Sequence, residues 1–592
     1  MASSRGLEWL AQAAIACVLL SLPAWAGDYS ATQVGLLLLY GMGAQSVALC
    51  WGRAGFLPLG QALFFGLAAY LSAYGLKWFA DASAVTAIIC VVVAAFLAGL
   101  LAYVIALMVF ARRIDSGPFF SLITLALTML GFLLGNQWSS VTGGFNGLTE
   151  VPDLPFTDRY GNLYYVIAVC AIFITAFLTW IVKRPIGVLW NAVAENENRL
   201  QFFGFATHRL KAVAFGIAAG IAGLGGALYA PHEGIVTPQA LGTELSAQFV
   251  IWAAVGGRRS PLGAQLGALI IGLLAAQWRD QFSFWQVLIA AIFILVVRFF
   301  PEGLAGVGRI GSRLILGAKT ASKAASTPIA APTLNRDTRP QAAMPLLEFH
   351  NVEVSQSGVG ILNGLSLTVQ GKGISCVIGP NGAGKTSSFN AMTGRLPVKT
   401  GKVVVYGQDV VGRQAWQVSR LGVGRKFQIP SVFDRLSVED NMRIAIWANR
   451  IRPIDLLKSS PLHWTSPAKA RVQGRFAFIE ERQTSDAGSL SQGLRQMLEF
   501  AMVATMEPKL YLLDEPCAGL SAHETHEMMT AIKSTVEESE ASALVIEHDM
   551  SALERIADNV IVLHQGKKLA TGSLEDIRAS SEVKAVYAGG RK

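Results

Sequence analysis

The sequence has few charged residues and few cysteines. Asp, Glu, Lys and Arg make up only 15% of its 592 residues, against roughly a quarter in soluble domains. The six cysteines are scattered along the chain, and no two stand at a spacing typical of a metal site. The composition therefore argues against a disulfide-rich or cysteine-ligated metal protein and favours buried thiols in a reducing compartment.

Negative charge is also scarce, because the formal net charge is +9 at pH 7. A basic chain can indicate nucleic-acid binding. Here, however, many cations flank long apolar runs, which is typical of the cytoplasmic loops of membrane proteins. We therefore expect a lipid bilayer, and no nucleic acid, among the partners.

Apolar residues are in excess and unevenly distributed. They form 52% of the chain, and the long apolar runs lie before about residue 305. A chain of this length exceeds one compact core. We predict a multi-span α-helical membrane domain at 1–304 and a soluble α/β domain at 346–592. The Ala, Ser, Thr and Pro content of residues 305–345 predicts a flexible, partly extended linker between them.

Ten stretches approach the roughly twenty apolar residues of a spanning helix: 9–26, 32–50, 56–76, 84–110, 117–137, 163–182, 211–230, 244–256, 261–277 and 284–300. The stretch at 244–256 is short, so we expect it to be tilted or broken. Flanking cations fall at alternate ends if both termini are cytoplasmic: Arg5, Arg53, Arg112–Arg113, Lys183–Arg184, Arg258–Arg259 and Arg298. Since residues 9–26 end in Ala24-Trp25-Ala26, a cleaved secretory signal is the alternative for the first stretch.

The segment 183–211 is polar and, by the charge pattern, cytoplasmic. It contains a helix-compatible run around Glu195 and Glu197. One interpretation is a solvated loop, and the other is a short helix that docks on a cytosolic partner and couples two domains.

Several stretches of the apolar half resemble the permease family of branched-chain amino acid ABC importers, which also serves urea and short amides: 56–66, 117–120, 142–148, 183–230 and 301–304. The resemblance spans nearly all of 30–305 and implies that 183–211 is the ATPase-coupling loop. It departs at Gln61, where relatives often have His.

Residues 379–386 fit the G-x-x-x-x-G-K-[ST] phosphate loop. The loop follows an apolar strand at 373–378 and enters a helix near Lys385, so backbone N–H groups and the helix N-terminus can face phosphates. We expect Lys385 to reach the β- and γ-phosphates and Thr386 to hold Mg²⁺. The predicted ATP-binding residues of the loop are Gly379, Pro380, Asn381, Gly382, Ala383, Gly384, Lys385, Thr386 and Ser387.

A buried strand at 510–513 precedes Asp514 and Glu515. Asp514 is suited to bind Mg²⁺ and Glu515 to polarise the attacking water, although solvated acids at a strand end are the alternative. Gln428 follows a probable strand and can place an amide near Mg²⁺ and the water. His548 follows the strand 543–546 and can contact a γ-phosphate. We therefore predict Glu515, His548 and Gln428 as catalytic and Thr386, Gln428 and Asp514 as metal-binding.

A fifth motif at 490–496 opens a helix, where Ser491 and Gly493 offer donors to a phosphate. Together the five motifs resemble an ABC-transporter ATPase over 346–592, closest to the urea or short-amide branch. The resemblance implies that Ser491 and Gly493 act on ATP held by an opposite cassette. It also implies that 429–489 form a helical subdomain facing the permease loop.

Three positions depart from the pattern of this family. Leu494 replaces the usual signature Gln, Gln356 aligns with the aromatic residue that commonly stacks on adenine, and Ser521 stands where Asp or Asn is common. None removes Glu515 or His548, so we expect ATP hydrolysis, with an asymmetric pair of ATP sites.

The sequence as a whole predicts an ATP-driven importer subunit of the bacterial inner membrane, with its ATPase domain in the cytoplasm. The resemblance implies branched-chain amino acids or urea and short amides as cargo. It also implies a periplasmic binding protein, and a second permease and ATPase or a second copy, as partners. An exporter half-transporter is the main alternative. A regulatory cassette beside a passive channel is another, against which the intact Glu515 and His548 argue.

Overall fold

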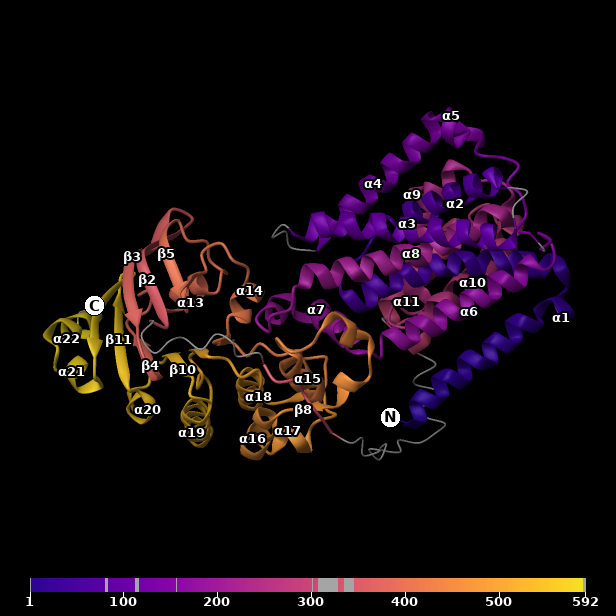
Figure 1. The fold of residues 1–592 in the computed structure, drawn as a ribbon. Coiled ribbons are helices and arrows are strands. Elements are labelled where there is room, and N and C mark those ends of the chain that lie inside the picture. The colour runs from indigo at the N-terminus through magenta and orange to yellow at the C-terminus, as the bar shows by residue number, and fades with distance from the viewer. Residues whose placement is uncertain are drawn as a thin grey trace. The chain divides into compact units, whose positions relative to one another are not determined.

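The computed structural model describes residues 2–79, 83–111, 117–155, 157–300, 302–306, 328–334 and 345–588. It divides into two compact units, one formed by residues 1–194 and 208–326 and the other by residues 195–207 and 327–592. The first unit is helical and the second contains the β-sheets (Figure 1). The segment 195–207 therefore groups with the C-terminal unit, although the helices before and after it belong to the N-terminal unit.

Each of the ten expected apolar stretches overlaps a helix, although residues 56–60 of the third precede α2. Stretches 9–26 and 32–50 share α1, which breaks at Gly27, where φ is +79°. The helices of this unit are α1 (Ala2–Leu49), α2 (Gln61–Trp78), α3 (Ala84–Ala111), α4 (Pro118–Gln137), α5 (Ser139–Thr142), α6 (Leu163–Ile181), α7 (Pro185–Gln201), α8 (Thr207–Glu233), α9 (Thr243–Gly256), α10 (Pro261–Gln281) and α11 (Trp285–Phe299). The last residues of α7 and the first of α8 extend into the other unit.

Within the described ranges, six helices are long and apolar enough to cross a membrane by length and composition. The helix α9, at 14 residues, is not among them. Ten crossings therefore remain a prediction, and the flanking pair Arg112–Arg113 lies outside the described residues.

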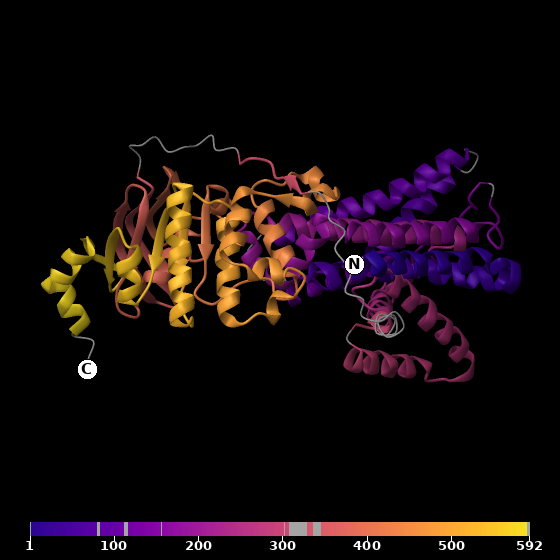
Figure 2. The same cartoon turned by 90° about the horizontal axis from the view of Figure 1, so that it is seen from below.

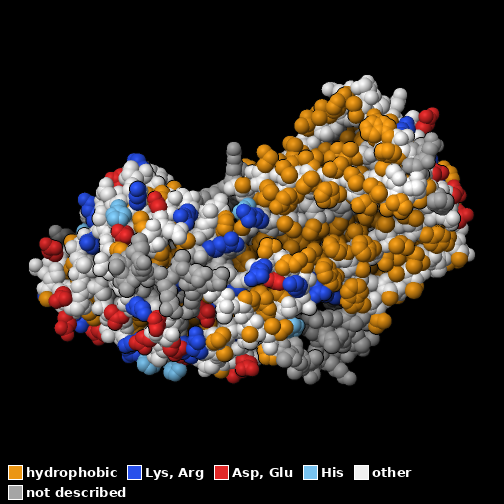
Figure 3. All heavy atoms as spheres, in the orientation of Figure 1, with side chains coloured by type: hydrophobic (Ala, Val, Ile, Leu, Met, Phe, Trp, Pro, Cys, Tyr) orange, Lys and Arg blue, Asp and Glu red, His pale blue; other side chains and the backbone are white. Residues whose placement is uncertain are grey.

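The helical unit buries small residues and exposes large apolar ones. On α3, Ala98 and Ala102 are buried whereas Phe96 and Leu100 are exposed. Lipid tails solvate large apolar side chains as well as a protein core does, so small residues gather where helices approach closely. At Gly226 of α8, a Cβ atom would lie 1.9 Å from the carbonyl oxygen of a phenylalanine on α2. Figure 2 shows that helices of this unit run alongside one another, and Figure 3 shows the apolar surface of the unit.

The C-terminal unit contains a six-stranded sheet in the order β12-β11-β4-β10-β9-β7. Its strands are β12 (Lys567–Gly572), β11 (Asn559–His564), β4 (Gly373–Ile378), β10 (Ser542–Ile546), β9 (Leu510–Asp514) and β7 (Val423–Lys426). All neighbouring pairs are parallel except β11 with β12. The carboxyl ends of the five parallel strands therefore meet at one edge, where ligands bind in open α/β sheets.

A second, antiparallel sheet of four strands has the order β3-β2-β5-β6. Its strands are β2 (Leu347–Gln356), β3 (Val359–Val369), β5 (Thr400–Val405) and β6 (Gln408–Asp409). Buried apolar residues of both sheets form one core, which includes Phe349 of β2, Leu512 of β9 and Leu544 of β10. Helices α13 (Lys385–Met392), α14 (Ala415–Arg420), α19 (Ala522–Ser539), α20 (Met550–Ile556), α21 (Leu574–Ala579) and α22 (Ser581–Ala588) complete this part.

The helical subdomain expected at 429–489 consists of α15 (Val438–Trp447), α16 (Pro467–Arg475) and α17 (Phe478–Glu481), followed by α18 (Gln492–Thr505). Most of the expected linker lies outside the described residues. Its described part, 328–334, contains β1 (Ile329–Ala330), which pairs in parallel with β8 (Trp464–Thr465). The Ala331 N–H donates to the Thr465 carbonyl at 2.8 Å, so this part of the linker is anchored to the subdomain.

Candidate functional site

The phosphate loop connects β4 to α13 at the carboxyl edge of the parallel sheet. Gly379, Gly382 and Gly384 have φ values of +150°, +81° and +95°. Glycine adopts this region without the strain that a Cβ atom causes. A Cβ atom at Gly379 would also lie 2.1 Å from the Leu563 carbonyl oxygen, whereas none of the described atoms lies within 4 Å of one at Gly382. The loop therefore forms an open cradle of backbone N–H groups.

Lys385 is held inside this cradle. Its ammonium donates to the carbonyl oxygens of Gly379 at 2.7 Å and Pro380 at 3.1 Å. Burial lowers its pKa, and the charges of Glu515 and Asp514 oppose that shift. A cation beside a ring of backbone N–H groups fits the multiple negative charge of a nucleotide phosphate.

Two oxygen groups suited to Mg²⁺ meet beside the loop. The Thr386 hydroxyl lies 3.3 Å from a carboxylate oxygen of Asp514, at the end of β9. Burial raises the pKa of Asp514, and the Arg425 cation 3.9 Å away opposes that rise. A hydroxyl and a buried carboxylate at one point match the oxygen ligands that Mg²⁺ prefers.

The three residues predicted to be catalytic lie together. One carboxylate oxygen of Glu515 accepts from the Gln428 amide at 2.8 Å, and the other lies 2.9 Å from Nε2 of His548. The backbone of Glu515 has a φ of +43°, and its N–H donates to the Ile546 carbonyl of β10 at 2.9 Å. The positive φ and the hydrogen bond to the neighbouring strand thus orient this carboxylate between an amide and an imidazole.

A further carboxylate supports this arrangement. Glu547 accepts from the backbone N–H groups of Cys517 and His548, both at 3.1 Å. Burial raises the pKa of Glu547. The side chain ties the segment after β9 to the segment after β10, and so orients His548 relative to Glu515.

Ser491 and Gly493 lie at the start of α18. The Ser491 hydroxyl caps this helix by accepting from the Leu494 N–H at 3.3 Å. Ser491 is exposed, and in the described part of the chain no hydrogen bond links it to the phosphate loop. A Cβ atom at Gly493 would lie 2.5 Å from a carboxylate oxygen of Glu524. Among the described residues, the exposed Ser491 and the buried Gly493 therefore lie at the helix start without a hydrogen bond to the phosphate loop of their own chain.

The departures from the family pattern have local structural roles. Ser521 caps α19 in a capping box with Glu524, whose carboxylate accepts from the Ser521 N–H at 2.9 Å and from its hydroxyl at 2.8 Å. A serine suits this role well. Gln356 ends β2 and pairs across a tight hairpin with Val359, which is 66% exposed. Neither residue contacts Glu515 or His548 in the described structure.

The segment 195–207 is bound within the ATPase unit. The α7 helix is interrupted at Asn196, where φ is −150° and ψ is 81°, and the chain after it runs over the cassette. The Glu195 carboxylate accepts from the Arg435 N–H at 2.6 Å, and the Asn196 amide donates to the Ser431 hydroxyl at 3.1 Å. The Ser419 hydroxyl donates to the Phe202 carbonyl at 2.8 Å. These contacts agree with the docking interpretation rather than with a solvated loop.

Arg199 carries the most deeply buried of these contacts. Both its side chain and that of Glu499 have no exposed surface, and the two charges are 3.2 Å apart. The same guanidinium donates to the Arg425 carbonyl at 2.7 Å and stacks on Phe427, 5.4 Å from the ring centroid. Desolvation of two ions is costly unless they are paired with good geometry, so the pair fixes where this segment can dock.

Glu499 also binds the segment that carries Gln428. Its carboxylate accepts from the Phe427 N–H at 3.1 Å and lies 3.9 Å from the Lys426 ammonium. Gln496, one turn earlier on α18, hydrogen-bonds the Lys426 ammonium and donates to the Gln428 carbonyl at 3.1 Å. A single carboxylate thus joins Arg199, the strand β7 and the helix α18.

The sequence patterns did not identify this buried cluster, because its members lie far apart in the chain. A weak signal was present, since Glu499 interrupts an otherwise apolar run. A charge at such a position is buried only when it is paired. The cluster also extends to Asp514, which was predicted to bind Mg²⁺, because Arg425 accepts from Arg199 through its carbonyl and its guanidinium lies 3.9 Å from the Asp514 carboxylate.

Comparisons with known proteins match both units. A family model described as branched-chain amino acid transport system / permease component matches residues 30–297, and one described as ABC transporter matches residues 362–518. The high-affinity branched-chain amino acid transport ATP-binding protein BraF of Pseudomonas aeruginosa is 32% identical over 251 residues, which are 41% of this chain and 98% of that protein. The LivG protein of Escherichia coli K12, of the same description, is 31% identical over 42% of this chain and 99% of its own.

A solved structure of a nucleotide-free ATP-binding cassette from an ABC transporter is also similar. It has a TM-score of 0.35 and 22% sequence identity, over 41% of this chain and 99% of the other.

A relative above 30% identity is thus matched over almost its whole length, and the permease model covers most of the helical unit. Both findings favour import over the exporter alternative. The chain belongs to the ABC transporter family and joins, in one multi-pass membrane protein, a permease of the branched-chain amino acid transport type to the ATP-hydrolysing cassette that drives import.

Proposed function

We propose that Glu515 is the residue that activates water for ATP hydrolysis in this importer. The observation that carries the proposal is the position of its carboxylate, which lies between the Gln428 amide and the His548 imidazole. A carboxylate so oriented can accept a proton from the attacking water, while the amide and the imidazole hold the water and the γ-phosphate in place.

The phosphate loop supplies the binding groups for ATP in this proposal. Its backbone from Gly379 to Ser387 faces the phosphates, and Lys385 exchanges its two carbonyl partners for phosphate oxygens. Thr386, Asp514 and Gln428 would hold Mg²⁺. Bound Mg²⁺ would neutralise the charge that develops on the phosphate oxygens.

Ser491 and Gly493 act, in this proposal, on ATP bound by an opposite cassette. Their position at the start of α18, where Ser491 is exposed, supports that role, because helix N-termini bind phosphate oxygens. A second ATPase and a second permease, or a second copy of this chain, would then complete the transporter. If the partner is a distinct ATPase, the departures at Gln356 and Leu494 would make the two ATP sites differ in activity, whereas two copies of this chain would form identical sites.

The cargo is proposed from the relatives and the resemblance. BraF and LivG are described as branched-chain amino acid transport proteins, and the cassette motifs resemble those of the urea or short-amide branch. We infer that this importer carries a branched-chain amino acid, urea or a short amide, delivered by a periplasmic binding protein.

The test is the Glu515→Gln variant in the assembled transporter. It keeps the shape of the side chain and removes its proton-accepting charge. We expect ATP turnover and solute uptake to be lost while ATP binding, followed with a fluorescent ATP analogue, stays unchanged. Undiminished ATPase activity in the purified variant complex would refute the assignment.

A further inference from the structure

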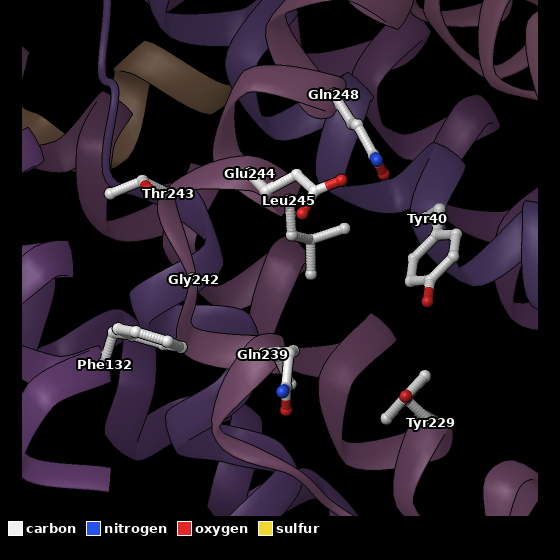
Figure 4. A pocket seen from close by; sticks show the side chains of 10 residues that line it. Tyr40, Phe132, Tyr229, Gln239, Gly242, Thr243, Glu244, Leu245 and Gln248 are labelled. Atoms are coloured by element: carbon white, nitrogen blue, oxygen red, sulfur yellow. The ribbon is translucent and has the colours of Figure 1, made fainter. Parts of the chain in front are cut away.

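A cavity of about 350 Å³ opens in the helical unit beside the start of α9. Its lining comes from α1, α4, α8, α9 and the short helix at Pro238–Leu241. Six of its side chains carry polar atoms: Tyr40, Tyr229, Gln239, Thr243, Glu244 and Gln248. Glu244 and Gln248 project from α9 toward Tyr40 of α1 (Figure 4). Phe132 and Leu245 add apolar surface.

The position of α9 places this cavity inside the bilayer. Its 14 residues span only about 21 Å, against about 30 Å for the hydrocarbon core. The helix ends directly before Arg258 and Arg259, and the Arg258 guanidinium lies 4.9 Å from the ring centroid of Trp51. Because such cations mark the cytoplasmic boundary, the first turn of α9 begins within the membrane.

Glu244 stands in that first turn. An ionisable residue at such depth is costly, and it typically contacts a transported solute or ion. Its side chain is exposed, and none of the other described residues forms a hydrogen bond or ion pair with it. A structural role would have required a partner, so the carboxylate is available to a solute.

The cavity also offers hydrogen-bond donors. Gly242 precedes α9 without a side-chain cap, and the first intrahelical bond runs from the Ser246 N–H to the Gly242 carbonyl. The N–H groups of the first turn therefore have no intrahelical acceptor and carry partial positive charge. In transporters, the starts of such short helices bind the oxygen atoms of solutes.

These groups define the chemistry of a ligand. Glu244 and the amide of Gln248 accept N–H bonds, and the helix start donates to an oxygen. None of the described residues that line the cavity is Lys or Arg, so an anion without N–H groups would lack a counter-ion beside a carboxylate. The apolar surface and the volume suit a small solute.

We infer that this cavity is the solute-binding site of the membrane domain. It takes a small solute whose N–H donors stand beside a carbonyl or carboxylate oxygen, as in urea, a short amide or a zwitterionic amino acid. The N–H groups bind Glu244 and Gln248, and the oxygen binds the first turn of α9. The inference rests on the proposed import function and assigns the residues that recognise the cargo.

The experiment measures ATP-driven uptake by the full transporter in proteoliposomes, with radiolabelled urea, acetamide and leucine in separate arms. Glu244→Gln removes the charge and keeps the shape, and Gln248→Leu removes the amide. We expect each variant to raise the KM for the carried solute about tenfold. The matched control is Gln137→Leu, an exposed glutamine at the end of α4 outside the cavity, for which KM stays unchanged.

The outcomes separate this inference from the function on which it rests. Wild-type KM values in both cavity variants would refute the site, as would uptake of none of the three solutes. Uptake by the wild-type transporter that does not depend on ATP would instead refute ATP-driven import. If a cavity variant fails to assemble, Gln248→Cys provides a second test, because the carried solute should slow its labelling by a charged methanethiosulfonate. Labelling at the same rate with and without solute would overturn the inference.

Discussion

Replacing Arg199 by methionine removes the charge that pairs with Glu499 and keeps a long side chain that can still pack. The two side chains are completely buried and 3.2 Å apart. The variant therefore leaves the Glu499 carboxylate in the core of the ATPase unit without its nearest cation. Since Arg199 belongs to the segment between two permease helices, the loss weakens the docking of that segment to the cassette.

The magnitude follows from what remains around Glu499. Removing one member of a buried ion pair costs about 3–5 kcal/mol. The Phe427 N–H still donates to the carboxylate at 3.1 Å, and the Lys426 ammonium remains 3.9 Å away. We therefore expect the lower end of this range, about 3 kcal/mol. This loss lowers the equilibrium constant for docking by a factor of roughly 10².

The assay compares solute uptake with ATP hydrolysis in proteoliposomes. A weakly docked segment leaves the cassette able to bind ATP, but hydrolysis no longer moves the permease. We expect uptake per ATP hydrolysed to fall by at least tenfold in Arg199→Met. The control is Arg209→Met, because Arg209 follows the same segment and is exposed. The double variant Arg199→Met/Glu499→Gln should lose less than the sum of the two single effects, since it leaves no buried ion unpaired.

Two results would contradict this reasoning. Uptake per ATP in Arg199→Met that equals that of Arg209→Met would show that the pair carries no coupling. Strictly additive effects of the two single variants would show that the two charges act independently, despite their distance.

Three further changes test local features. Gly384→Ala should strain the phosphate loop by about 1–3 kcal/mol, because φ is +95° there. This strain should raise the Kd for ATP, and an unchanged Kd would contradict it. Ser521→Ala removes the helix cap shared with Glu524 and should lower the stability of the cassette by about 1 kcal/mol. A lower unfolding temperature would confirm this, and an unchanged unfolding temperature would show that the cap does not stabilise the cassette. Ala331→Pro removes the N–H that donates to Thr465 and should speed proteolysis near residue 330, while equal cleavage rates would mean that the short strand does not anchor the linker.

Local motifs of the cassette could be predicted because contiguous residues carry them. The strand before the phosphate loop was expected at 373–378, and β4 spans Gly373–Ile378. A helix was expected near Lys385, where α13 begins. Backbone conformation and helix starts depend on neighbours in the sequence, so glycine spacing and apolar runs suffice to locate them.

The apolar stretches could be predicted as well. Residues 9–26 and 32–50 were expected as separate helices, and α1 consists of two helical parts that meet at the non-helical Gly27. Glycine adopts the φ of +79° at this kink without the strain that a Cβ atom causes. The described part of the linker, in contrast, pairs as β1 with β8, which its composition did not indicate.

By itself, the sequence determined the order of the domains, the phosphate loop and the chemical identity of the residues around ATP. Only the tertiary structure decided that Glu515 lies between Gln428 and His548, because three parallel strands bring their ends to one edge. Tertiary structure alone also paired Arg199 with Glu499. The physical reason is that a motif encodes local backbone geometry, whereas two charges far apart in the sequence meet only where the fold buries them side by side.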